Sequence, residues 1–300
     1  MSSTTGAVIS GCLAPHPPHL IYALNPSQNE PEATGSGAWK ALIDGYESLR
    51  ESISNKEFDV IIVHTPHWKT VIGHHLLGVE SFKGLSVDPI FPNLFRYSYD
   101  LRIDVELSEA IAAEAEARGL VTSMMRNPDF RVDYGTLTTC HLARPEWDIP
   151  LVVISSGRPY FYYNNDVGDR EMLALGEATL AAVEKSGKRA LVLASTSLSH
   201  RHFTDEPEDP EDPRFENIYN ANQAAWDERW LALITEGKGR QILAEMPDFI
   251  EQSISECKDG SMTWLLATLG VPDYPGIVHG YGSIIGTGNA VVEWTPGAHT

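Results

Sequence analysis

Residues 60–68 read Val-Ile-Ile-Val-His-Thr-Pro-His-Trp, a short apolar run that passes directly into a histidine-bearing segment. Four consecutive apolar residues, all of them β-branched, predict a strand that is buried on both faces, because a half-exposed strand would alternate polar and apolar positions. The proline that follows Thr65 is expected to stop the strand. The run therefore predicts a buried strand with His64 and His67 on the loop at its carboxyl end.

Three further buried strands are predicted elsewhere in the chain. Residues 7–13 are mostly apolar and lead into a Pro-rich loop that carries His16 and His19. The other predicted strands are residues 151–154 and 190–194, and the predicted helices are residues 39–53, 171–185, 215–235 and 248–269. Strand–helix–strand order predicts a parallel sheet, and ligands usually bind at the carboxyl edge of such a sheet.

The remaining sequence predicts a loop and a terminal hairpin. Residues 206–213 are too rich in proline and aspartate for regular structure. Residues 283–285 and 290–292 flank Gly-Thr-Gly-Asn (286–289), which is typical of a hairpin turn rather than a phosphate loop. Since there is no repeat and no Gly/Ser linker, we expect one α/β domain over residues 1–300. Its central sheet should be mostly parallel or mixed and flanked by helices, with the active site at the carboxyl ends of the strands.

Composition and charge argue against several classes of function. The 300 residues are 42% hydrophobic and 21% charged, as in ordinary globular proteins, and the formal net charge is −19. Nucleic acids and anionic membranes attract basic surfaces, so neither is an expected partner. The three cysteines are scattered and lack CxxC spacing, and we find neither a targeting segment nor an apolar run of about 18 residues. These features predict a soluble cytoplasmic protein.

Histidines gather at the ends of three predicted strands. The pairs, among eleven histidines, are His16 with His19, His64 with His67, and His200 with His202. Imidazoles and a carboxylate suit Fe(II), Zn(II) or Mn(II). Two His and one carboxylate on one face of an octahedron leave room for a bidentate substrate and O2. Spacing alone does not establish such a centre, because H-x-x-H is common by chance.

Six motifs occur in an order that resembles one enzyme family. They are Cys12–Leu20 (CLAPHPPHL), Val63–Trp68 (VHTPHW), Asp133–Thr136 (DYGT), Leu198–Phe203 (LSHRHF), Glu256–Leu265 (ECKDGSMTWL) and Gly286–Trp294 (GTGNAVVEW). Together they resemble the class III extradiol dioxygenases, the superfamily of the protocatechuate 4,5-dioxygenase β subunit, over nearly the whole chain. Within it, the chain is most similar to the catalytic β subunits of aminophenol-cleaving enzymes.

The resemblance implies a set of site residues and a cofactor. His16, His67 and Glu256 would be the ligands of Fe(II), and His200 would be the acid–base residue beside the substrate. Tyr134 stands in DYGT, where catechol-cleaving relatives typically carry His. This departure favours an aminophenol-type substrate, which the enzyme would cleave with O2 to give a semialdehyde, and gives Tyr134 a role at the substrate.

The sequence leaves several roles open. His19, His64 and His202 are candidates for substrate-binding or supporting positions, and His19 and His64 are more often packing or hydrogen-bonding residues than ligands. Glu251 competes with Glu256 as the carboxylate ligand, because both fall within one predicted helix. His74 and His75, which are adjacent in the sequence, are expected to be structural or exposed.

Rival functions remain as well. The substrate could be a catechol or protocatechuate type, or the same residues could form a zinc hydrolase. The chain could also be a non-catalytic partner subunit, although the presence of all three candidate ligands argues against this. A homodimer and an α2β2 assembly with a related non-catalytic chain both fit the sequence.

Overall fold

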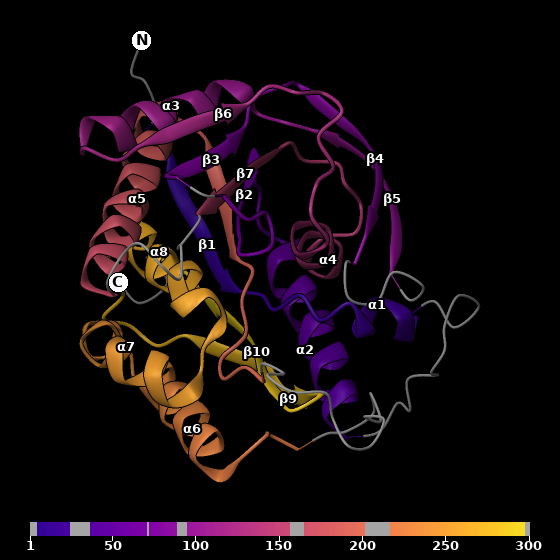
Figure 1. Ribbon diagram of the computed structural model, residues 1–300, viewed down its shortest axis with the longest axis vertical. Helices are drawn as coiled ribbons and strands as arrows, with labels where there is room; N and C mark the ends of the chain where they lie inside the picture. The colour runs from indigo at the N-terminus through magenta and orange to yellow at the C-terminus, as the bar shows by residue number, and fades with distance from the viewer. Residues whose placement is uncertain are drawn as a thin grey trace.

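The described residues form an α/β fold built on one large mixed sheet, as predicted (Figure 1). The structure is a computed structural model that describes residues 5–24, 37–70, 72–88, 95–156, 165–201 and 217–297. The sheet has eight strands in the order β6-β3-β7-β2-β8-β1-β10-β9, and β4 and β5 form a separate two-stranded sheet. The strands are β1 (Ala7–Leu13), β2 (Val60–Thr65), β3 (His74–Leu77), β4 (Ser81–Val87), β5 (Arg96–Arg102), β6 (Thr122–Met125), β7 (Leu151–Ser156), β8 (Arg189–Ala194), β9 (Ile277–Ile284) and β10 (Thr287–Trp294).

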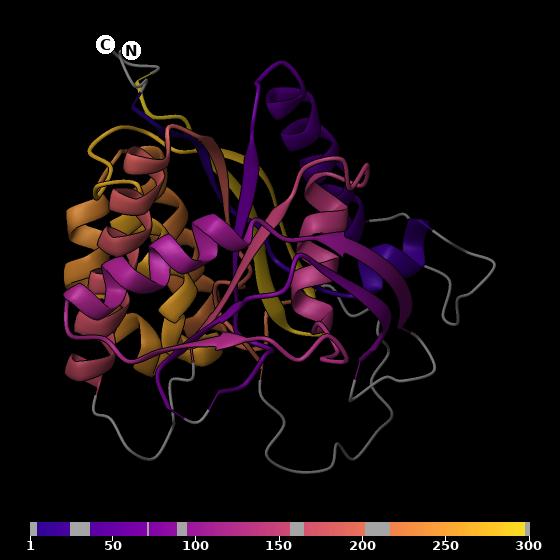
Figure 2. The ribbon, with the colours of Figure 1, turned by 90° about the horizontal axis from the view of Figure 1, so that it is seen from above.

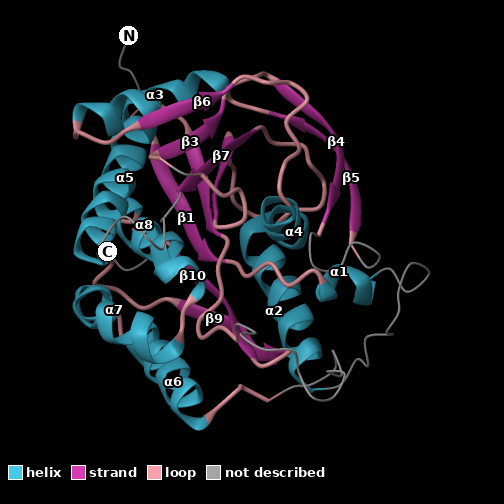
Figure 3. Ribbon diagram, viewed as in Figure 1, coloured by secondary structure: helices cyan, strands magenta, loops and turns pink. Residues whose placement is uncertain are grey.

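Helices cover both faces of the sheet (Figure 3). They are α1 (His19–Leu24), α2 (Gly37–Ser54), α3 (Val105–Ala117), α4 (Tyr134–Ala143), α5 (Asn165–Ser186), α6 (Ala221–Thr235), α7 (Gly239–Ser253) and α8 (Gly260–Thr268), with a 3-10 turn at Glu256–Asp259. Among the described residues, no helix combines the length and hydropathy that a membrane span requires.

The four central strands are parallel, which confirms the prediction from strand–helix–strand order. β2 lies between β7 and β8, and Ile62 pairs with Val152 on one side and Val192 on the other. β1 is parallel to β8. The outer strands make the sheet mixed, because β10 is antiparallel to β1 and to β9, and β3 is antiparallel to β7. The carboxyl ends of β1, β2 and β8 therefore meet at one edge.

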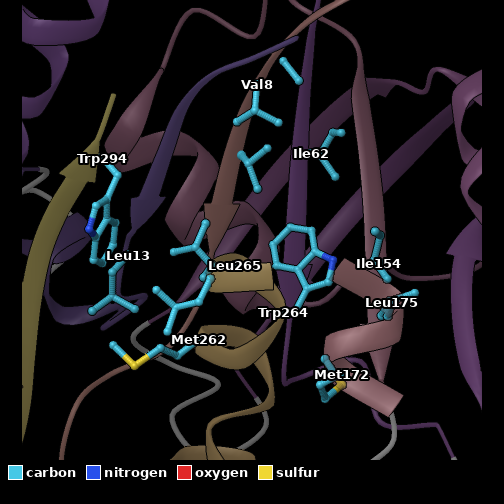
Figure 4. Packing of buried hydrophobic residues seen from close by; sticks show 14 of the residues in the cluster. Val8, Leu13, Ile62, Ile154, Met172, Leu175, Met262, Trp264, Leu265 and Trp294 are labelled. Atoms are coloured by element: carbon cyan, nitrogen blue, oxygen red, sulfur yellow. The ribbon is translucent and has the colours of Figure 1, made fainter. Parts of the chain in front are cut away.

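Two hydrophobic cores lie on opposite faces of the sheet, which explains why the central strands are continuously apolar. Val60 and Ile62 face the core beneath α3, α5 and α8, whereas Ile61 and Val63 face the core beneath α2 and α4. Figure 4 shows the first core, in which Trp264 lies among the strand side chains. Seen from above, the two helical layers stand on either side of the sheet (Figure 2).

Several predicted boundaries were wrong. β2 continues through Thr65, so His64 belongs to the strand rather than to the loop, and His19 is the first residue of α1. The helix predicted over 248–269 is two helices, α7 and α8, because Ile254, with a φ of 53°, ends α7 in the left-handed region. α6 begins at Ala221 instead of residue 215. The loop predicted at residues 206–213 lies outside the described residues.

The terminal hairpin is confirmed, with its turn shifted. β9 and β10 are antiparallel and Thr287 pairs with Ile284, so the turn is Ile285-Gly286. Both turn residues have positive φ, 50° and 79°, which is the geometry of the two-residue turns that match strand twist. Gly288, expected in the turn, instead lies in β10.

A buried ion pair joins β10 to the end of α2. Glu293 is fully buried, and its Oε1 lies 2.6 Å from Nζ of Lys56. Ser52 donates to Oε2 at 2.6 Å, and Ser10 and His279 also hydrogen-bond the carboxylate. Burial alone would raise the pKa of Glu293, but the hydrogen bonds outweigh it and lower the pKa to about 2.

Glu293→Gln is expected to lower the free energy of unfolding by about 3 kcal/mol at neutral pH, because it removes the carboxylate from a buried ion pair and leaves Lys56 without its partner. A lowered pKa stabilises the folded state above the unfolded-state value of 4.5, and this stabilisation is lost as pH falls towards about 2. Urea unfolding should therefore give a constant difference between parent and variant above about pH 5 and a shrinking one below it. The exposed Glu51→Gln on α2 is the control. A difference that does not change with pH would contradict this account.

Candidate metal centre

Three side chains from distant parts of the chain converge at the carboxyl edge of the sheet. His16 follows β1, His67 follows β2, and Glu256 begins the 3-10 turn between α7 and α8. Their donor atoms lie within 4.8 Å of one another and could hold a metal ion. The two Nε2 atoms are 2.7 Å apart, and Oε1 of Glu256 lies 3.4 Å from His16 Nε2 and 2.9 Å from His67 Nε2.

These separations match the spacing of ligands around one metal ion. Ligand atoms about 2.1 Å from a metal at neighbouring octahedral positions are about 3.0 Å apart. The three observed distances bracket this value, so the three donor atoms are close enough to bind one ion together.

The carboxylate of Glu256 is buried and ionised. Burial alone would raise its pKa, but the charges and hydrogen bonds of His16 and His67 outweigh it and hold the pKa well below its ordinary range. Its Oε2 is buried and has no hydrogen-bond partner among the described residues. An unsatisfied buried carboxylate oxygen is costly in a folded protein, so it indicates a position for a metal or ligand.

The backbone between α7 and α8 delivers Glu256 to the cluster. Ile254, Lys258 and Asp259 all have positive φ, which stops α7 and separates Glu256 from both helices. Glu251, the competing candidate, is exposed on α7 and is not part of the cluster. The expectation that both carboxylates share one helix was wrong, because the helix ends between them.

A hydrogen-bond network supports His16. Ser195, which directly follows β8, lies with its Oγ 2.8 Å from Nδ1 of His16. Thr139 of α4 hydrogen-bonds both Ser195 Oγ, at 2.8 Å, and the carbonyl of Ala14, at 2.9 Å. A hydrogen bond at Nδ1 fixes the ring and leaves Nε2 directed to the cluster, as in metal-binding histidines. Sequence reasoning missed Ser195, whose only signal was its position at the end of a predicted strand.

The DYGT motif supports His67. Asp133 caps α4 through the Thr136 N–H and accepts a hydrogen bond from Thr65 Oγ1 at 2.7 Å. Thr65 Oγ1 in turn accepts one from the His67 N–H at 3.2 Å. A Cβ at Gly135 would lie 3.0 Å from His67 Cδ2, so only glycine leaves the ring its present room.

Tyr134 and His200 lie beside the cluster. The hydroxyl of Tyr134 is 3.0 Å from Nε2 of His67. Nε2 of His200 is 3.9 Å from Oε1 of Glu256. Both side chains line the same cavity as two of the candidate ligands, so each is placed to reach a molecule bound next to the cluster.

The other predicted histidines occupy different positions. His19 is buried, lines the cavity and contacts the ring of Trp39, and burial lowers its pKa to about 4, so it is neutral. His64 lies beneath the site and hydrogen-bonds Ser156 and Ser261 at 2.8 Å each, away from the cluster. His202 lies outside the described residues.

The histidines of β3 have structural surroundings. Nδ1 of His74 hydrogen-bonds Ser156 Oγ at 2.8 Å, and burial lowers the His74 pKa to about 4. His75 is half-buried against the edge of Trp68. Neither residue lines the cavity.

A cavity of about 440 Å³ opens onto the cluster. This volume suits a small aromatic molecule. Its lining residues are His16, Pro17, Pro18, His19, Asp88, Tyr134, Ser197, His200, Arg201, Glu256, Ile284, Ile285, Thr287 and Asn289. Nothing in the sequence pointed to Asp88, and residues 284–289 were predicted only as parts of a hairpin.

Two imidazoles and one carboxylate that leave one side open to a cavity are typical of mononuclear non-haem oxygenases. Comparison with known families agrees. The chain belongs to the family described as the catalytic LigB subunit of aromatic ring-opening dioxygenase, whose model matches residues 11–292. It is a ring-cleaving dioxygenase, as its motifs predict.

Three relatives match most of the chain at different levels of sequence identity. A 2-aminophenol 1,6-dioxygenase beta subunit from Pseudomonas sp is 51% identical, over 96% of this chain and 94% of its own length. The corresponding alpha subunit from Pseudomonas sp is 23% identical, over 86% of this chain and 92% of its own. A 3,4-dihydroxyphenylacetate 2,3-dioxygenase from Escherichia coli is 25% identical, over 88% of this chain and 90% of its own length.

One solved structure shares the fold. An uncharacterized protein from Escherichia coli K12 superposes with a TM-score of 0.63 at 15% identity, covering 95% of this chain and 99% of that one. This similarity confirms the predicted α/β architecture.

Proposed function

We propose that the chain binds Fe(II) through His16, His67 and Glu256 and cleaves the ring of a 2-aminophenol-type substrate with O2 to give a semialdehyde. The convergence of these three side chains beside a cavity that also contains Tyr134 and His200 carries the proposal. The 51% identity to a 2-aminophenol 1,6-dioxygenase beta subunit supports the substrate class.

The donor set fits a ferrous ion. Two imidazoles and one carboxylate are the ligands that non-haem Fe(II) oxygenases use, and catalytic zinc sites can use the same donor set. Membership of a family of ring-opening dioxygenases favours iron over zinc. The buried Oε2 of Glu256, which has no hydrogen-bond partner in the described part of the chain, and the hydrogen bond at Nδ1 of His16 also suit a bound cation. When bound, the ion supplies the activation of O2 that protein side chains cannot provide.

His200 is proposed as the proton-transfer residue. Its Nε2 lies 3.9 Å from Oε1 of Glu256 and faces the cavity, next to the position that an ortho hydroxyl or amino group of the substrate would take. Imidazole both accepts and donates protons near neutral pH. His200 would therefore take a proton from the binding substrate and return it when the ring opens.

Tyr134 is proposed to hold the substrate. Its hydroxyl is 3.0 Å from Nε2 of His67. Once the lone pair of that nitrogen is used to bind a metal, the phenolic hydrogen is available to a substrate atom in the cavity. A tyrosine here keeps a hydrogen-bond donor at this position but removes a second imidazole, which favours the aminophenol class over the catechol class.

The test is reconstitution with Fe(II) under anaerobic conditions, followed by O2 uptake with 2-aminophenol, catechol and protocatechuate in parallel. We expect uptake with Fe(II) and 2-aminophenol and a semialdehyde product. Faster uptake with catechol would move the substrate to the catechol class, and uptake with none of the three would reject the proposal. Metal analysis of the anaerobically prepared chain tests the zinc alternative, and bound zinc in place of iron would instead favour a hydrolase.

A partner chain is the second variable in this test. A homodimer and an α2β2 assembly with a related non-catalytic subunit remain the two predictions. The relatives named as alpha and beta subunits support the second. O2 uptake should be measured for the chain produced alone and for the chain produced together with a related subunit.

Gly135→Ala should weaken Fe(II) binding without weakening the fold. The added Cβ would lie 3.0 Å from His67 Cδ2 and 3.1 Å from Asp133 Oδ1, so the ring must shift by a few tenths of an ångström. We expect an Fe(II) affinity about tenfold lower, as for other changes next to metal ligands. Alanine is the better helix former, so thermal unfolding of the metal-free variant should occur at the parent temperature or slightly above. An unchanged affinity would show that His67 moves freely.

A further inference from the structure

Helix α6 carries two fully buried polar side chains on one face, Gln223 and Asp227. They are four residues apart, so they lie one above the other on the helix. Buried polar groups are stable only when hydrogen bonds replace water, so their partners indicate what they hold. Apart from Tyr281 of β9, the partners belong to the segments that carry His200 and Glu256.

Asp227 fixes the residue directly before His200. Its Oδ1 accepts the Ser199 N–H at 2.8 Å, and its Oδ2 accepts the Ser199 hydroxyl and the Tyr281 hydroxyl at 2.8 Å each. A Cβ at Gly288 would lie 1.9 Å from Oδ2, so the glycine in β10 is needed for this carboxylate. The Gly288 N–H also donates to the Ser199 carbonyl at 3.0 Å.

Gln223 joins His200 to the segment that delivers Glu256. Its Nε2 donates to the carbonyls of His200, at 3.2 Å, and Ser253, at 2.9 Å. The His200 N–H donates to the same Ser253 carbonyl at 3.1 Å. Ser253 is the last residue of α7, three positions before Glu256. The backbone of His200 and the break after α7 are therefore bonded to each other directly and through Gln223.

We propose that Gln223 and Asp227 are positioning residues that fix His200 relative to Glu256. The proposal rests on the proposed function, in which His200 moves a proton and Glu256 binds the metal. Neither α6 residue lines the cavity, so both act through the backbone of their partners. A catalytic group displaced by about 1 Å loses on the order of a hundredfold in rate.

The surroundings of Asp227 suit this role. Burial raises its pKa to about 6, while the hydrogen bonds from Tyr281 and Ser199 act to lower it. The Ser199 N–H, the Ser199 hydroxyl and the Tyr281 hydroxyl all act as donors here. Only a carboxylate accepts all three with its two oxygens. Leucine has the same branched shape and accepts none, whereas asparagine keeps an acceptor for the Ser199 N–H.

The experiment compares Asp227→Leu, Gln223→Met and Asp227→Asn in the Fe(II)-loaded enzyme. For the first two we expect kcat with 2-aminophenol to fall about tenfold or more. The KM should stay within about threefold and the iron content should be unchanged, because neither residue touches substrate or metal. Asp227→Asn should retain kcat within about threefold. Glu228→Gln, an exposed neighbour on α6, is the matched control.

A second readout uses the metal-free chain. Amide hydrogen exchange in the peptide that contains Ser199 should be faster in Asp227→Leu than in the parent, because its acceptor is lost, and unchanged in Glu228→Gln. The proposal is overturned if Asp227→Leu and Gln223→Met both have the same kcat per bound iron as the parent. It is also overturned if their rates fall only in proportion to a loss of bound iron. If Asp227→Leu does not fold, Gln223→Met decides.

The two proposals fail differently. A parent enzyme that takes up no O2 with any of the three aromatic substrates rejects the proposed function, whatever the variants do. In that case the exchange rates still report whether Asp227 holds the Ser199 segment. An active parent with fully active variants rejects only the positioning role.

Discussion

His67→Ala should abolish ring cleavage because it removes the bound iron. The variant leaves only His16 and Glu256 as donors, and Nε2 of His67 lies within 3.0 Å of both their donor atoms in the parent. Even changes to residues that merely support metal ligands lower affinity by 10- to 100-fold, so removal of a ligand should cost at least about a hundredfold. His16→Ala should behave in the same way.

The measurement is iron per chain after anaerobic loading and desalting, together with O2 uptake. The parent should retain about one iron and each variant almost none. His75→Ala, which removes an imidazole outside the cluster, is the control and should keep both iron and activity. If His67→Ala retains iron with parent affinity, the proposed ligand set is wrong.

His200→Ala should give the opposite combination, full iron content with little turnover. His200 is not part of the three-residue cluster, so iron binding does not depend on it. Loss of a positioned acid–base group lowers kcat by about 10²- to 10⁴-fold. Substrate binding should change much less, because the chelating ligands and Tyr134 remain.

Single-turnover kinetics with pre-bound substrate separates these effects, since it measures the chemical steps without product release. His141→Ala, on α4 and outside the cavity lining, is the matched control. Parent rates in His200→Ala would assign the proton transfer to another group, of which Tyr134 is the nearest to the cluster.

The parallel part of the fold could be predicted from sequence because burial on both faces leaves a direct signal. Residues 60–63 and 190–194 are continuously apolar, and their side chains alternate between the two cores. The hairpin turn was misplaced for a physical reason. Its first residue, Ile285, is β-branched with positive φ, which residue preferences disfavour, while Gly288 is needed for contact with Asp227 rather than for a turn.

The candidate site was only partly predictable. H-x-x-H spacing does not distinguish His67 from His64, and the difference comes from β2, which continues one residue past His64 and turns that ring towards Ser261. The break after α7 has no glycine or proline to mark it, although Pro247 lies inside that helix without ending it. The position of Glu256 relative to Glu251 therefore followed from the family motif and not from helical periodicity.

The break between α7 and α8 also bears on the order of assembly of the enzyme. His16 and His67 come from the first quarter of the chain, and the third donor comes from near its end. No local segment can chelate the cation by itself, so a nascent polypeptide must complete its long-range contacts before the ion can be captured. A metal ion held by these three residues would therefore bind a finished tertiary structure by mass action and would not nucleate it, so loading would come late in the maturation of the enzyme.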